Sequence, residues 1–549
     1  MKTNFAKTHI NIANTAVKLL LIACLILISV FWATLVESEG SEKDAKTSAP
    51  PVIKLGLNVA CFNTLDPHQA ASSSDRILAD MVFNGLIRYK PGLAPDLEPD
   101  LALNIPEPEI INGEQVWTFH LRKGVLFHSA GNTSPKEMTA QTILLSFEKA
   151  MDPKRSAYAG GYDGINLKAL GPYTVCFTVN PPQSPLLFLP KVANYAGGFI
   201  VSKTDKGRLL GTGPFIIKDQ TDKNKFFLAA HTDYFRGTPC LGGVKIYFLP
   251  DSYLRLSEFH RHLDVICGES VADWINHAMT MGGKNTIIDS LGVPETANIH
   301  FNTLIQPFAD IRVRKAVAHA LSRDVFLESF GPGMAQNVFS PAPPFMPGGL
   351  TESEVRALGL HYPKDLKKSR QLLTEAGYPD GFQFEVVVSE MDQYKKNYMS
   401  LKKQLAAVNI HMVTRITDHA TMHQLIRKDL NPIVIYEAFR PNTDELLSRF
   451  FHSESIVMTG DKPVTNFSHY TGIDDLIEKA RAERIITRQV KLWEYAQIKL
   501  LEDMVVYPLH FRKHTYVRKK YVDYGHAVKA AMALYPQITE NTCLLNRAN

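Results

Sequence analysis

The sequence has few cysteines and none of the short motifs by which metal sites, redox sites and phosphate-binding loops are recognised. Its six cysteines are scattered over 549 residues without a C-x-x-C pair, which argues against a zinc ribbon or a thioredoxin-type site. The Gly-Gly-Lys run at 282–284 lacks the earlier glycine and the following Ser or Thr of a P-loop. A G-x-S-x-G nucleophile elbow is absent too. We therefore predict no catalytic residue and no cofactor.

An excess of charge of one sign is also missing. The 60 basic and 55 acidic residues leave a net charge of +5, and no long Lys/Arg block occurs, so nucleic acid is not an expected partner. The sequence contains no repeat of 20 to 50 residues, so a solenoid is not expected. Apolar residues make up 45% and charged residues 21%, as in average soluble proteins, and the length suggests about three domains.

The N-terminus carries a long apolar run. Three lysines precede an uncharged stretch at 19–36, which ends at Glu37. As a helix these residues would extend about 27 Å, which is long for a secretion signal and just enough to cross a bilayer core. Residues 1–36 are therefore predicted to be either a cleaved signal peptide or a retained membrane anchor. Both leave the rest of the chain outside the cytoplasm.

A polar segment follows this run. Residues 37–51 are mainly Ser, Glu, Lys, Asp, Ala and Pro, which cannot bury apolar surface, and we expect a flexible linker there. The folded part begins near Val52. Outside the cytoplasm one or two disulfides are conceivable, although the sequence cannot pair the cysteines; the alternative is that they are buried as small hydrophobic residues.

Strand and helix patterns alternate over the rest of the chain. Strands are expected at 52–57, 117–121, 173–179, 215–218, 226–230, 244–249, 382–388 and 412–416. Helices are expected at 139–150, 311–322, 366–376, 401–408, 473–483 and 489–501. This alternation is typical of α/β or α+β lobes.

Several segments occur in an order that resembles one protein family. The segments are Leu65-Asp66-Pro67, Phe83-Asn84-Gly85-Leu86, 95–102, Trp117 to His128, Gly211-Thr212-Gly213-Pro214-Phe215, 231–235, 300–303, 307–316 and 372–381. Together they resemble the bacterial extracellular solute-binding proteins of family 5, the dipeptide, oligopeptide and nickel-binding group. The resemblance runs from about residue 52 to about 511.

This resemblance implies an α/β fold of the periplasmic-binding-protein type. It has two lobes with mixed sheets, a hinge, a central ligand cleft and an extra subdomain in the first lobe. We expect lobe I at 52–85, 205–298 and 505–549, the extra subdomain at 86–204, and lobe II at 299–504.

The implied function is that of a solute-binding receptor of an ABC importer, which captures a peptide or peptide-like solute and delivers it to a membrane permease. We expect a monomer in the periplasm or on the outer face of the cytoplasmic membrane. Three alternatives stay open: a membrane-tethered ligand sensor, a receptor for a non-peptide solute such as a nickel chelate, haem or an anionic small molecule, and an exported hydrolase.

The resemblance also indicates where a ligand would bind. In peptide-binding relatives an aspartate in the far lobe holds the α-amine of the ligand, and Phe439 occupies that position here, next to Arg440. Phenylalanine cannot pair with a buried ammonium, whereas arginine favours an anionic group. Glu437 or Asp444 could replace the aspartate. Tyr436, from the same strand end, is a further candidate.

Two other loops contribute candidates. Thr64, Leu65 and Ser72 lie in a stretch of the first lobe that is rich in small polar residues, and Ser389, Glu390 and Tyr394 follow the strand at 382–388. Loops that follow strands at a lobe interface are common ligand sites. His419 and His423 are four residues apart and can share a helix face, but the sequence supplies no third ligand, so we predict no metal site.

Overall fold

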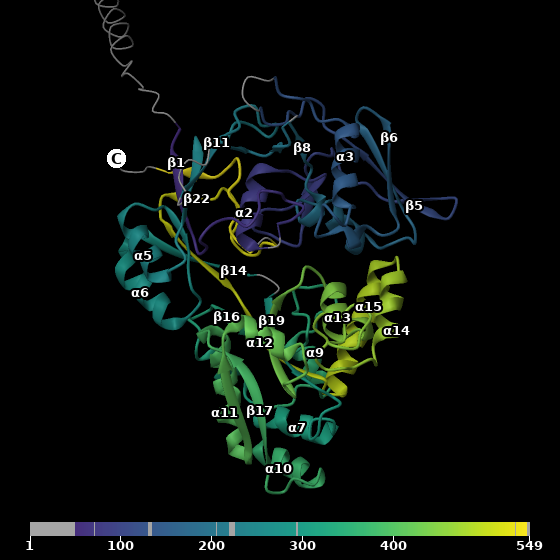
Figure 1. Ribbon diagram of the computed structural model, residues 1–549, viewed down its shortest axis with the longest axis vertical. Coiled ribbons are helices and arrows are strands. Elements are labelled where there is room, and N and C mark those ends of the chain that lie inside the picture. The colour runs from purple at the N-terminus through teal and green to yellow at the C-terminus, as the bar shows by residue number, and fades with distance from the viewer. Residues whose placement is uncertain are drawn as a thin grey trace, which may run out of the picture. The chain divides into compact units, whose positions relative to one another are not determined.

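The computed structural model describes residues 50–70, 72–129, 134–204, 206–218, 225–292, 295–532 and 534–545. Val52–Asn549 form one compact unit (Figure 1). The signal or anchor expected at 1–36 and nearly all of the expected linker lie outside the described residues. Within the described ranges, no helix combines the length and the apolar character that a membrane span needs.

A seven-stranded sheet forms the base of lobe I. Its order is β10-β11-β12-β1-β13-β21-β14. Strand β1 (Val52–Leu57) lies at its centre, parallel to both β12 and β13, and has the bounds expected from the sequence. Ile53, Leu55 and Leu57 are at most 5% exposed, since alternate side chains point into one core. The other strands are β10 (Phe215–Ile217), β11 (Lys225–Ala230), β12 (Gly243–Phe248), β13 (Val265–Cys267), β14 (Thr286–Leu291) and β21 (His514–Lys519).

A four-stranded sheet forms the centre of lobe II. Its order is β16-β20-β15-β19, and its strands are β15 (Glu295–Phe301), β16 (Ala335–Asn337), β19 (Ile433–Phe439) and β20 (Val506–Arg512). Two further strands, β17 (Phe382–Ser389) and β18 (Ile410–Thr417), pair in parallel beside it. Helices α7, α10 and α11 pack on these strands around one large apolar core (Figure 1).

A third sheet, β4-β5-β7-β6, has an apolar core of its own. It is built from β4 (Glu109–Ile111), β5 (Glu114–His120), β6 (Ile165–Gly171) and β7 (Thr174–Val179). The indole of Trp117 stacks on Phe188 at 4.7 Å between ring centres. Because this core is separate, we call the region around it the small subdomain.

The remaining elements complete the two lobes and the small subdomain. The helices are α2 (Ser73–Val82), α3 (Ala140–Ala150), α4 (Pro185–Phe188), α5 (Ser252–Arg261), α6 (Ala272–Gly282), α7 (Ile311–Ala320), α8 (Arg323–Leu327), α9 (Glu352–Ala357), α10 (Leu366–Glu375), α11 (Asp392–Leu405), α12 (His419–Ile426), α13 (Thr443–Phe451), α14 (Asp474–Ala482) and α15 (Ile486–Glu502). Short strands pair as β2 (Ile87–Tyr89) with β3 (Leu97–Pro99), β8 (Ser202–Lys203) with β9 (Leu209–Leu210), and β22 (Val522–Asp523) with β23 (Cys543–Leu544).

The chain passes between the two large sheets at two places. The first connects β14 to β15, between Leu291 and Glu295, and the second connects β20 to β21 through Lys513. Figure 1 shows β14 running from the sheet of β1 toward that of β19. The lobe limits expected from the sequence, at 298/299 and 504/505, stay a prediction; below, lobe II means the region of the four-stranded sheet, with β15 and β20 included. The two connections are where a hinge between the sheets would bend.

One helix was predicted too short. The sequence indicated a helix at 401–408, whereas α11 begins at Asp392 and ends at Leu405. Tyr398 and Leu401 belong to the same buried face as Leu405, each at most 3% exposed. In the first half of the helix, Lys395 and Lys396 interrupt the apolar pattern, and this obscured its period there.

A disulfide joins Cys240 to Cys543, two residues 303 positions apart. Replacing both with serine is expected to lower the free energy of unfolding by about 2–4 kcal/mol, because the unfolded chain regains the freedom that the cross-link removes. Urea denaturation with and without reductant measures this. Cys61, which is free and exposed, supplies the control Cys61→Ser, expected to leave the midpoint unchanged. Equal midpoints for oxidised and reduced protein would contradict the prediction.

Candidate functional site

A cavity of about 510 Å³ is lined by residues from both lobes and the small subdomain. Lobe I and the small subdomain contribute Tyr89, Ala94, Pro95, Leu97, Pro185, Leu186, Leu189, Pro190, Gly292 and the stretch 529–532. From lobe II come Phe345, Met346, Pro347, Pro441, Asn442, Thr443, Ile486, Trp493, Phe511 and, in the connection, Lys513. A cavity of this size between two lobes suits a small ligand.

The cavity wall is apolar with few exceptions. Its only charged lining groups are Lys513 and Lys529, and the described residues around it include no carboxylate. Neither lysine has a carboxylate within 4.0 Å in the part of the chain that the structure describes. The cavity therefore favours an apolar body, and its electrostatic potential favours a negative charge.

One wall depends on the close approach of two chain segments. The carbonyl of Gly92 accepts hydrogen bonds from the backbone N–H groups of Lys529 and Ala530, each at 3.1 Å. Gly92 has φ +68°, and a Cβ there would lie 1.5 Å from the carbonyl oxygen of Ala527. Glycine is thus required for the segment 529–532 to line the cavity.

A buried hydrogen bond joins the small subdomain to lobe II. The hydroxyl of Ser184, just before α4, donates to Oε1 of Gln489 on α15 at 2.6 Å. The amide of Gln489 in turn donates to the carbonyl of Ala480 on α14 at 2.7 Å. Both Ser184 and Gln489 are fully buried. This contact holds the small subdomain against lobe II next to the cavity.

A buried ion network lies at the two connections between the sheets. Nε of Arg512 donates to Glu437 at 2.7 Å and its Nη2 donates to Glu295 at 3.0 Å, while His514 contacts the same Glu295 oxygen at 2.8 Å. Burial raises the pKa of Glu295, but Arg512 and His514 more than offset this and bring it to about 2. Burial raises the pKa of Glu437 above its ordinary value, although Arg512 opposes the rise. Glu437 is thus already paired with an arginine.

Phe439 and Arg440 lie at the end of β19, facing lobe I. The ring of Phe439 is 6.4 Å from that of Tyr195, and the guanidinium of Arg76 lies over both rings, at 6.0 Å and 4.9 Å. Arg440 donates to the carbonyl of Phe439 at 2.8 Å and lies over the ring of Phe450 at 4.7 Å. The structure therefore brings these two predicted residues together with side chains of the small subdomain and α2.

Three more predicted residues gather around two histidines. The hydroxyl of Ser389 is 3.1 Å from Nδ1 of His419, and the ring of Tyr394 stacks on His419 at 4.7 Å. The Nε2 atoms of His419 and His423 are 3.1 Å apart. Glu390 follows Ser389 and is exposed. Among the described residues no cluster of three metal-ligating side chains occurs.

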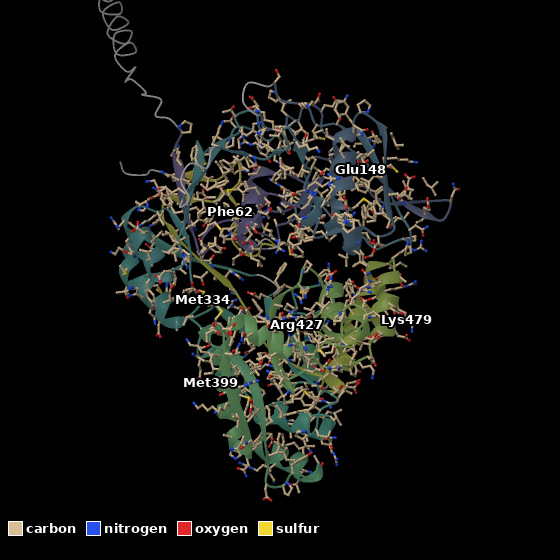
Figure 2. All side chains as sticks on the ribbon, in the orientation of Figure 1. Phe62, Glu148, Met334, Met399, Arg427 and Lys479 are labelled. Atoms are coloured by element: carbon tan, nitrogen blue, oxygen red, sulfur yellow. A yellow bond between two sulfur atoms is a disulfide. The ribbon has the colours of Figure 1, made fainter. Side chains whose placement is uncertain are left out.

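Arg427 connects this group to Tyr436. Its Nη1 donates to Nδ1 of His423 at 3.2 Å and its Nη2 to the hydroxyl of Tyr436 at 3.3 Å. Arginine only donates, so Nδ1 of His423 is the acceptor, and the proton on Nε2 points toward His419. Figure 2 shows Arg427 on the side of lobe II nearest to lobe I. The ring of Tyr436 packs on Phe450 and Phe467, which makes it largely a core residue.

The other predicted residues lie apart from the cavity wall. Thr64 accepts a hydrogen bond from the backbone of Asp66, Leu65 is 36% exposed, and Ser72 caps the N-terminus of α2. Asp444 accepts from Arg481 at 3.2 Å. It borders a second, more polar cavity of about 730 Å³ between α14 and the segment 181–191.

The lining residues of the first cavity were not predicted. Leu186 and Leu189 follow two prolines that mark a loop, and Trp493 lies in a helix whose pattern indicates only burial. Each comes from a different part of the chain, and no sequence spacing links them. Arg76 and Tyr195 were missed for the same reason.

The comparisons with known proteins give the family. Residues 90–455 match the family description "Bacterial extracellular solute-binding proteins, family 5 Middle". A solved structure titled as the PBP/SBP MoaA in complex with mannopinic acid, from A.tumefacien R10, is 32% identical, with a TM-score of 0.73 over 91% of this chain and 100% of that one. The chain therefore belongs to family 5 of the bacterial extracellular solute-binding proteins and has their two-lobed α/β fold. It is a solute-binding protein, as its sequence motifs predicted.

Other relatives are named for different solutes. Heme-binding protein A of Haemophilus influenzae is 28% identical over 330 residues, which cover 56% of this chain and 58% of that relative. Di/tripeptide-binding protein 2 of Pseudomonas aeruginosa is 25% identical over 78% of this chain and 84% of the relative. The structure of HbpA2 from Haemophilus parasuis, at 21% identity and a TM-score of 0.74 over 90% of this chain and 99% of that one, shares the fold.

Proposed function

We propose that this protein is the receptor of an ABC importer, which encloses a small solute between its lobes and delivers it to a separate membrane permease. The observation that carries the proposal is the cavity of about 510 Å³, whose wall comes from both lobes and the small subdomain. A ligand in such a cavity contacts both lobes only when they are together, so its binding favours the closed form. The solutes in the names of the relatives, peptides among them, are also small organic molecules.

Native mass spectrometry of the protein purified from its own host tests this proposal. We expect one non-covalently bound small molecule, released intact on unfolding. Adding it back to stripped protein should change the fluorescence of Trp493, which lines the cavity. The recovered solute should stay chemically unchanged on long incubation, as expected of a monomeric receptor that catalyses nothing. Turnover of the solute, or a native protein that never retains one, would contradict the proposal.

The N-terminal segment bears on the same proposal. We propose export to the periplasm, or to the outer face of the cytoplasmic membrane, directed by residues 1–36. The intact mass of the native protein shows whether these residues are removed. A retained segment, together with a signalling partner instead of a permease, would favour the tethered sensor over the importer receptor.

A further inference from the structure

The carboxylates around the end of β19 are all paired. Glu437 accepts from Arg512, Asp444 accepts from Arg481, and Glu445 accepts from Arg449 at 3.0 Å. Glu437 and Asp444 are buried in their pairs, whereas Glu445, with its side chain 42% exposed, borders the second cavity. An ammonium buried beside Phe439 would meet no unpaired buried carboxylate of this group, which is unfavourable.

The cation between these pairs has no carboxylate of its own. Arg440 donates only to the carbonyl of Phe439 and, at 3.4 Å, to the hydroxyl of Thr465, and its buried Nε has no hydrogen-bond partner. Among the described residues no carboxylate lies within 4.0 Å of its guanidinium. Burial lowers the pKa of Arg440, although Tyr436 and Glu445 oppose the fall.

A second arginine approaches from α2. Burial lowers the pKa of Arg76, but Tyr195 and Tyr158 more than offset this and raise it above its ordinary value. The guanidinium of Arg76 lies over the ring of Tyr195 at 4.9 Å, and its Nε is buried without a partner. No ion pair of Arg76 occurs in the described chain. Arg76 also lies over the ring of Phe439 at 6.0 Å, and Arg440 is the next residue and donates to the carbonyl of Phe439 at 2.8 Å. The two guanidinium groups thus approach Phe439 from the two sides of the inter-lobe interface.

The cavity of about 510 Å³ next to Phe439 is also lined by positive charge. Phe439 packs against the apolar cluster of Leu291, Ala531 and Leu534, of which Ala531 lines the cavity. Pro441, Asn442 and Thr443, which follow Arg440 in the chain, also line it. Its only charged lining groups are two lysines. The interface therefore presents cations on both sides of Phe439, and the buried carboxylates of Glu437 and Asp444 nearby are already paired with arginines.

We infer that Arg76 and Arg440 bind an acidic group of the solute, whose apolar part occupies the cavity beside Phe439. An anion placed between two guanidinium groups offsets the desolvation of both and accepts charge-assisted hydrogen bonds from each. A carboxylate is the simplest such group, and a free α-amine is not required. This inference rests on the proposed function, and it names the class of solute: small organic anions with an apolar body.

Three probes of the same shape test the inference on the full chain. They are 3-phenylpropionate, 3-phenylpropanamide and 3-phenylpropylamine, which carry a negative, a neutral and a positive end group. Calorimetry at neutral pH should show the carboxylate bound at least about tenfold more tightly than the amide, and the amine weakest. Added salt should weaken binding of the carboxylate alone.

Variants assign the effect to the arginine pair. Arg440→Gln and Arg76→Gln should each weaken the carboxylate at least about tenfold and leave the amide unchanged. Arg440→Lys, which keeps the charge, should retain part of the preference and serves if the glutamine variant does not fold. Arg415→Gln removes an arginine from an exposed pair with Glu385 on β17 and β18, and it should change nothing.

The inference is overturned if the amine binds as well as the carboxylate, if the carboxylate does not bind, or if both glutamine variants bind it normally. A cationic solute recovered from the host would also overturn it while leaving the receptor proposal intact. Failure to retain any solute would instead count against the receptor itself.

Discussion

Replacing Arg512 with methionine is expected to destabilise the protein by about 3–5 kcal/mol at neutral pH, because the change leaves two buried carboxylates without their common partner. Glu437 and Glu295 are 3% and 17% exposed, and both accept hydrogen bonds from this guanidinium. Urea denaturation followed by circular dichroism measures the loss. The exposed pair of Arg415 with Glu385 gives the control Arg415→Met, which should cost less than about 1 kcal/mol.

The stability lost in Arg512→Met should depend on pH in a defined direction. Without Arg512, burial raises the pKa of Glu437 further above its value in the unfolded chain. A carboxyl group with a raised pKa in the folded state binds its proton more tightly there, so stability rises as the pH falls. The deficit of the variant should therefore be smaller at pH 5 than at pH 7. An equal deficit at both pH values would contradict this explanation.

In the wild type the sign is opposite for Glu295. Its pKa in the folded protein is about 2, below the ordinary value of a glutamate. Its stabilising contribution is complete above roughly pH 4.5 and is lost as the pH falls toward 2. Glu295 should therefore add almost no pH dependence between pH 7 and pH 5, the range in which the deficit of the variant relative to the wild type is expected to shrink.

The ion network of Arg512, Glu295, Glu437 and His514 lies at both connections between the two large sheets. Arg512 ends β20, His514 begins β21 and Glu295 begins β15, so the ion pairs join both connections between the sheets. Any rotation of one lobe against the other must bend the chain at these residues. The network therefore lies where such a bend would occur.

The sequence predicted secondary structure correctly where buried and exposed residues alternate regularly. Val52–Leu57 has apolar residues at every second position, and the strand has the bounds expected from that pattern. The start of helix α11 was not predicted, because lysines in its first half interrupt the apolar pattern. The order of short motifs, from Leu65-Asp66-Pro67 to the segment at 372–381, was enough to give the family.

The site was predicted only where one chain segment carries it. Phe439 and Arg440 follow a recognisable strand, so the departure from aspartate was visible in the sequence. Their partner Arg76 was not, because a sequence does not show whether an arginine is paired. Whether a carboxylate is available is equally a property of the fold: Glu437 and Asp444 were candidates until the structure placed Arg512 and Arg481 against them.

The pairing of Cys240 with Cys543 illustrates the same limit. Sequence showed that disulfides were possible, but bringing these residues to a Cα–Cα distance of 5.4 Å depends on β23 lying beside β22 and on the turn after β11. Contacts over 303 residues arise from the complete fold, and so does the cavity, whose wall combines segments from 89 to 532.

Filling the cavity should abolish solute binding without unfolding the protein. Ala530 lines the cavity, while its backbone N–H donates to Gly92 and its carbonyl accepts from Ala94, so Ala530→Trp keeps both hydrogen bonds and places an indole in the space of the ligand. We expect affinity for the host solute to fall at least about 100-fold, equivalent to about 2.7 kcal/mol. Calorimetry measures the affinity, and thermal unfolding should show a similar midpoint. Ala527→Trp, three residues earlier and exposed, is the matched control and should bind normally. If Ala530→Trp folds and still binds the solute with wild-type affinity, the ligand does not occupy this cavity, and the acidic group would have to be held by Arg76 and Arg440 with the rest of the molecule elsewhere.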